Sequence, residues 1–115
     1  MFQLCNLSVI ALLFNKLASI TRMKVTTSSY AAEYVGAFFF ILSIFVSGGN
    51  PLIIGGALAL VIFLIAGVSG GHVNPAVSLA MMMNNSINTV EFAGYVAAQL
   101  AGGASAYYAY RALKH

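Results

Sequence analysis

Charge is what this sequence has least of. Only 6% of its 115 residues are Asp, Glu, Lys or Arg, whereas 61% are hydrophobic. Soluble globular domains carry about 25% charged residues. The composition therefore excludes an ordinary soluble globule and indicates a membrane protein, while the length allows at most one domain.

Cysteine and histidine are almost as scarce. The single Cys5 excludes an internal disulfide and gives no information about the compartment. The only histidines are His72 and His115, so no cluster of metal ligands can be assembled with Cys5. We therefore expect no metal site and no cofactor.

The few charged residues also argue against two broad functions. Five scattered cations without interleaved aromatic residues leave no electrostatic footprint for a nucleic acid. No nucleophile–base pair and no carboxylate pair is visible, so we do not expect an enzyme. The cations all lie outside the long apolar runs, as charges that flank membrane spans do: Lys16, Arg22, Lys24, Arg111 and Lys114.

Three apolar runs predict an all-α membrane protein. Residues 31–47, 52–68 and 91–110 are each long enough, or nearly so, to cross a hydrocarbon core of about 30 Å. The third run ends in tyrosines 107, 108 and 110, which suit the interface between membrane and water. Residues 31–115 are thus expected to form one multi-pass membrane unit.

Residues 1–30 are expected to form a separate N-terminal segment. Its apolar part contains Asn15 and Lys16, which would be costly at bilayer depth, and no basic region precedes it. Three interpretations remain: an amphipathic segment on the membrane surface, a targeting sequence, or a poor extra span. The sequence favours the surface segment.

The segment between the second and third runs contains GGHVNPAVSLA, which is poor material for a membrane span. Residues 69–74 can cover about 20 Å if they are extended. Residues 75–83 can return about 13 Å as a helix, and Asn74 followed by Pro75 is a strong helix start. Residues 69–83 are therefore predicted to form a re-entrant loop and half-helix.

A re-entrant loop has a physical consequence. Non-helical backbone at membrane depth is tolerated only where it is buried in protein or lines a water-filled cavity. Backbone carbonyls before Asn74 would accept hydrogen bonds from small polar molecules, and the Asn74 amide would donate at the narrow point. The positive N-terminal end of the half-helix would disfavour cations and protons there.

Three sequence elements together resemble the aquaporins, the major intrinsic protein family of water and glycerol channels. SGGHVNPAVSLA is similar to the first Asn-Pro-Ala loop of that family. AEYVGAFFF resembles the Glu-x-x-Gly element of its first span, and YVAAQLAGG resembles the Tyr-x-x-Ala-Gln element of its third. The resemblance covers residues 31 to about 110 and corresponds to the N-terminal half of such a channel.

The resemblance implies roles for individual residues. Asn74, Pro75 and Ala76 would be the pore signature, and Ile54 would occupy the filter position that is aromatic in many relatives. Glu33 and Gln99 would support the loop. The backbone that lines the pore would be that of Gly70, Gly71, His72 and Val73.

The roles that the resemblance implies for Glu33 and Gln99 each have a simpler alternative. Glu33 is only the third residue of its apolar run, so it could instead be exposed to water at the end of the span. Gln99 could instead form hydrogen bonds between helices. For His72 we favour a structural side chain over a proton shuttle.

The chain is similar to only half of such a channel. The second Asn-Pro-Ala motif and the filter arginine that follows it are absent, and Asn50-Pro51 is interpreted as a turn before the second run. We expect a channel subunit for water or small neutral solutes such as glycerol. Its partners would be the lipid bilayer and a second half, supplied by another copy or by another half-channel; the alternative is a non-conducting half-channel that associates with full-length channels.

Overall fold

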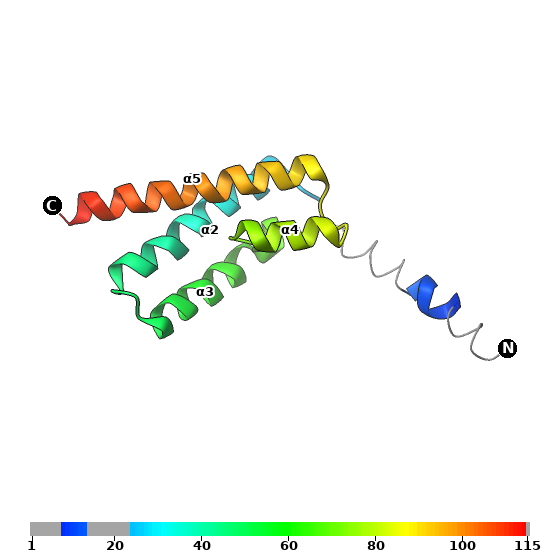
Figure 1. Ribbon diagram of the computed structural model, residues 1–115, viewed down its shortest axis with the longest axis horizontal. Helices are drawn as coiled ribbons and strands as arrows, with labels where there is room; N and C mark the ends of the chain where they lie inside the picture. The colour runs from blue at the N-terminus through cyan, green and yellow to red at the C-terminus, as the bar shows by residue number, and fades with distance from the viewer. Residues whose placement is uncertain (1–7, 14–23, 115) are drawn as a thin grey trace.

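The structure, a computed structural model, describes residues 8–13 and 24–114. Residues 8–13 are helical and exposed, and the rest of the predicted N-terminal segment up to residue 23 lies outside the described residues. Four longer helices follow (Figure 1), with these bounds: α2 Thr27–Val46, α3 Pro51–Ser69, α4 Pro75–Met83 and α5 Thr89–Leu113.

The helix α2 begins earlier than its apolar run predicts. The Thr26 N–H donates to the Ser29 hydroxyl at 3.1 Å, and the Ser29 N–H donates to the Thr26 carbonyl at 2.9 Å. The expected boundary between residues 30 and 31 therefore falls inside α2, and the N-terminal segment ends before Thr27. Hydroxyl residues ahead of the apolar run start the helix because they satisfy its free N–H groups.

Asparagine starts the other helices. The Asn50 side chain accepts hydrogen bonds from the N–H groups of Leu52 and Ile53, and Pro51 stands at the first helical position. Asn74 with Pro75 begins α4 in the same way, and Asn88 forms a capping box with Glu91 at the start of α5. Asn50-Pro51 thus belongs to a turn and helix start, as the sequence indicates.

The short helix α4 has the bounds predicted for the half-helix, 75–83, and its re-entrant position in a membrane stays a prediction. Residues 70–74 between α3 and α4 are not helical. The prediction was wrong for Ser69, which is the last residue of α3 and not the first of the loop. The helix continues to Ser69 because Gly70, at a φ of 90°, supplies the left-handed residue that terminates it.

The helices pack as an open bundle. α2 lies between α3 and α5, and the short α4 packs on α5 (Figure 1). The α2–α3 turn and the C-terminal end of α5 lie at one end of the bundle, opposite the C-terminal end of α4 (Figure 1). A small core holds Ala37, Val61 and Val73, and most other large apolar side chains are exposed.

These exposed apolar surfaces suit a membrane. α2 and α3 are both long and apolar enough to cross one. The 25-residue α5 is long enough, but it is not among the described helices that are apolar enough to count as candidate spans. That α5 forms a third span stays a prediction.

Candidate functional site

Glu33 is the centre of a buried hydrogen-bond network. One carboxylate oxygen, Oε1, accepts from the Ser69 hydroxyl at 2.7 Å and from the His72 N–H at 2.8 Å. The other, Oε2, accepts from the Val73 N–H at 2.6 Å and from Gln99 Nε2 at 3.0 Å. The side chain is 0% exposed, so the interpretation of Glu33 as a water-exposed residue at the end of a span is wrong.

The loop that Glu33 holds has a strained backbone. Val73 adopts a φ of 57°, in the left-handed region that β-branched residues rarely enter. Such a conformation persists only where its surroundings impose it. The short bond to Glu33 and the burial of the Val73 side chain, which is 4% exposed, provide that constraint.

In the loop before α4, N–H groups form hydrogen bonds but the carbonyls of residues 70–73 do not. Gly71 donates its N–H to the Ser69 hydroxyl, while His72 and Val73 donate theirs to Glu33. Within the part of the chain that the structure describes, no carbonyl of residues 70–73 accepts a hydrogen bond. These carbonyls therefore have no hydrogen-bond partner among the described residues.

Gln99 connects three elements through its amide nitrogen. Nε2 donates to Glu33 on α2 and to the Ser78 hydroxyl on α4 at 2.9 Å, and the Ser78 hydroxyl also bonds His72 Nδ1 at 2.9 Å. Gln99 therefore forms hydrogen bonds between helices, which is one of its two interpretations, and its support of the loop stays a prediction. Its amide nitrogen must face the carboxylate, because a flip would place two oxygens together.

One polar atom of this network has no partner. Gln99 Oε1 is the single buried side-chain oxygen or nitrogen without a hydrogen bond among the described residues. The carboxylate of Glu33 fixes the amide, so the oxygen cannot gain a partner by a flip. A buried carbonyl without a donor is costly.

Several hydroxyl residues of the site were given no role from the sequence, although Tyr95 is the tyrosine of the Tyr-x-x-Ala-Gln element. The Tyr95 hydroxyl donates to the Ser69 carbonyl at 2.6 Å, and the Ser29 hydroxyl donates to the Val68 carbonyl at 2.7 Å. Both bonds satisfy carbonyls at the C-terminal end of α3. Tyr95 and Gln99 are four residues apart on α5 and so share one face, which is the spacing of the Tyr-x-x-Ala-Gln element.

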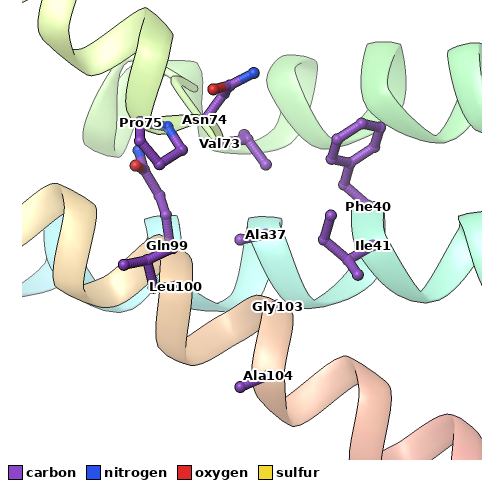
Figure 2. Close-up of a pocket in the computed structure, with 10 residues that line it drawn as sticks. All are labelled: Ala37, Phe40, Ile41, Val73, Asn74, Pro75, Gln99, Leu100, Gly103 and Ala104. Carbon is purple, nitrogen blue, oxygen red and sulfur yellow. The ribbon is translucent and has the colours of Figure 1, made fainter.

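Asn74 lies at the edge of a pocket of about 400 Å³ (Figure 2). Its side-chain oxygen caps α4 by accepting from the Ala76 N–H at 2.8 Å, and its Nδ2 donates to no other described residue. The pocket is mostly apolar and lies between α2, α5 and the start of α4. It is lined by Ala37, Phe40, Ile41, Val73, Asn74, Pro75, Gln99, Leu100, Gly103 and Ala104.

The structure does not bring every predicted site residue to this pocket. Ile54 lies half-buried in the first turn of α3, at the end of that helix far from the loop, and does not line the pocket. Ala76 is exposed in the first turn of α4. His72 is buried, with its ring against Tyr95 at 4.8 Å between centroids.

The sequence is similar to proteins whose names include glycerol facilitators and aquaporins. Glycerol uptake facilitator protein-like 6 of Lactiplantibacillus plantarum is 37% identical over 81 residues, which are 64% of this chain and 38% of that protein. Human aquaporin-9 is 48% identical over 46 residues, 40% of this chain and 16% of the relative. Rat aquaporin-5 is 54% identical over 35 residues, 30% of this chain and 13% of the relative.

The chain thus spans well under half the length of these relatives. No solved structure matches it. The family model described as Major intrinsic protein matches residues 7–113, which is nearly the whole sequence. With its all-helical fold and buried Glu33 network, the chain therefore belongs to the major intrinsic protein family and is a membrane protein.

Proposed function

We propose that this chain is a channel subunit for the passive passage of water or small neutral solutes such as glycerol. α2, α3 and α5 would cross the membrane, and residues 70–74 with α4 would form the re-entrant part. The observation that carries the proposal is the loop held by Glu33, which engages the His72 and Val73 N–H groups and leaves the carbonyls of residues 70–73 without partners.

These open acceptors fit a neutral permeant. A file of carbonyls can replace the hydrogen bonds that a water molecule or a hydroxyl group loses on leaving bulk solvent. The free Nδ2 of Asn74 adds a donor beside them. The N-terminal end of α4, equivalent to about half a positive elementary charge, disfavours cations at the same place.

A second half is required to enclose such a path. The pocket beside Asn74 is open, and Gln99 Oε1 within the surrounding network lacks a donor among the described residues. We propose a second copy, inserted in the opposite orientation, as the group that covers the pocket. The positive-inside rule permits both orientations, because three cations precede α2 and two lie at the end of α5.

The names of the relatives agree with this class of permeant. They are a glycerol uptake facilitator-like protein and several aquaporins. Since the chain covers only part of each, their activities come to it as a proposal. A non-conducting half-channel remains the competing outcome of the test.

Filling the pocket should stop transport without unfolding the chain. Ala104 is exposed and lines the pocket, so Ala104→Phe should occupy the space that the second half needs. Ala101 is also exposed on α5 but does not line the pocket, and Ala101→Phe is the matched control. Osmotic swelling of vesicles that hold the purified chain gives the water and glycerol permeabilities.

We expect wild type and Ala101→Phe to conduct equally, and Ala104→Phe to fall to the permeability of empty vesicles. Equal permeability of all three proteins would exclude the pocket as the place of the second half. If wild type never exceeds empty vesicles, the chain alone is a non-conducting half-channel and the proposal is wrong.

A further inference from the structure

The C-terminal end of α5 carries a group of aromatic and basic side chains that the proposed transport path does not use. We call it the α5 end cluster and define it as Tyr107, Tyr110, Arg111 and Lys114. We propose that the α5 end cluster binds the headgroup of an anionic phospholipid. This inference rests on the part of the proposed function that places α5 across the membrane.

The cluster is organised on one face of the helix. Tyr107 and Arg111 are four residues apart, as are Tyr110 and Lys114, so the two pairs lie along one side of α5. Arg111 Nη1 donates to the Tyr107 hydroxyl at 3.0 Å, and its guanidinium lies 5.9 Å from the centre of the Tyr107 ring. Lys114 Nζ lies 5.5 Å from the centre of the Tyr110 ring.

A contact with α2 fixes the position of the cluster. Phe45 stacks on Tyr110 with 5.0 Å between ring centres, and it also contacts Tyr107 at 6.0 Å. Phe45 is the penultimate residue of α2, so the cluster lies where that apolar helix ends. Tyrosine and basic residues at the end of a span are expected at the level of the lipid headgroups.

The cluster has no acidic side chain to neutralise it. The chain contains only Glu33 and Glu91. Glu33 is buried in the loop network, and Glu91 lies in the first turn of α5, near the opposite end of the bundle. Arg111 has five N–H donors, and the described residues engage its side chain in one hydrogen bond, to Tyr107.

A phosphodiester suits the donors that remain. A guanidinium can bind two phosphate oxygens at once, and an ammonium adds a second positive charge. The surroundings favour a lipid as the source of that phosphate, because Tyr108 and Leu113 beside the cluster are each 71% exposed. These apolar surfaces would contact the glycerol and acyl region of the same molecule.

Native mass spectrometry of the detergent-purified chain can test the assignment. The probe is an equimolar mixture of phosphatidylglycerol, which is anionic, and phosphatidylcholine, which is zwitterionic. The wild-type chain should retain phosphatidylglycerol in preference to phosphatidylcholine. Arg111→Gln/Lys114→Gln should reduce that preference by about fivefold for each cation, the factor expected from the attraction of one basic residue to an anionic surface.

The matched control is Lys24→Gln. Lys24 precedes α2 at the other end of the bundle, is exposed, and its side chain has no aromatic or hydrogen-bond partner among the described residues. Its removal lowers the net charge without touching the cluster, so the preference should stay unchanged. Circular dichroism should show unchanged helix content in all variants, since Arg111 and Lys114 are exposed.

Three results would overturn the assignment: no preference in wild type, an equal loss in Lys24→Gln, or displacement of the lipid by millimolar inorganic phosphate. The last result would identify free phosphate as the ligand. Lipid retention is measured without any solute flux. A failure of the proposed channel function and a failure of this inference are therefore distinguishable.

Discussion

Glu33→Gln is expected to lower the free energy of unfolding by about 2–6 kcal/mol. Each carboxylate oxygen accepts two hydrogen bonds, one of them from the loop backbone. The glutamine amide nitrogen would replace one of these oxygens and face two donors. Each buried donor left without an acceptor costs about 1–3 kcal/mol.

The variant should also release the loop locally. Hydrogen exchange at the His72 and Val73 amides, whose acceptor is Glu33, should accelerate more than exchange within α2. Glu91→Gln is the matched control, because a capping box functions with either Glu or Gln. If Glu33→Gln and Glu91→Gln unfold alike and loop exchange is unchanged, the network does not hold the loop.

Gly102→Ala is expected to destabilise the chain by about 1–3 kcal/mol, as overpacking of a close contact does. A Cβ at Gly102 would collide with the Tyr34 carbonyl oxygen and lie 3.1 Å from the Ala37 Cβ and from the Phe38 nitrogen. Two of these atoms are backbone, so no side-chain rotation relieves the collision. α2 and α5 would have to separate. This would also move Gln99 on α5 away from Glu33 on α2.

Gly103→Ala is the control for this prediction. A Cβ there meets only Ile41 Cγ1, at an ordinary contact distance of 3.7 Å. Alanine is a better helix former than glycine by about 1 kcal/mol, so this variant should be neutral or slightly stabilised. Denaturant unfolding in detergent gives both free energies. Equal free energies of unfolding for the two variants would contradict the close contact of α2 and α5 at Gly102.

The sequence predicts the helical elements well because local chemistry determines them. Asn74 and Pro75 start the half-helix through a side-chain cap and a fixed φ, and both are visible in the sequence. The same logic applied to Thr26 and Ser29 would have placed the start of α2 correctly. Apolar runs alone could not place the start of α2, because they indicate which residues face lipid and not where the helix begins.

The network around Glu33 could be predicted only in outline. A carboxylate in an apolar run must find donors, and the resemblance to aquaporins indicated the loop. The partners Ser69, Ser78 and Tyr95 depend on how α3, α4 and α5 pack, which no local pattern encodes. The strained backbone of Val73 could not be predicted from the sequence either, because it depends on the hydrogen bond to Glu33.

The proposed pairing of two inverted copies has one direct test, thiol cross-linking at each end of α4. In a Cys5→Ser background, Val77→Cys places a thiol on the third residue of α4, and Met83→Cys places one on the last. The two sites are six residues apart, or about 9 Å along the helix. Val77 and Met83 are 36% and 73% exposed, so both thiols can react.

Inverted copies bring the N-terminal ends of their half-helices together near the middle of the membrane and place the C-terminal ends at opposite surfaces. A short cross-linker should therefore join two chains through residue 77 and fail at residue 83. Efficient cross-linking at residue 83, which requires copies in the same orientation, or none at residue 77 would contradict the proposed pairing.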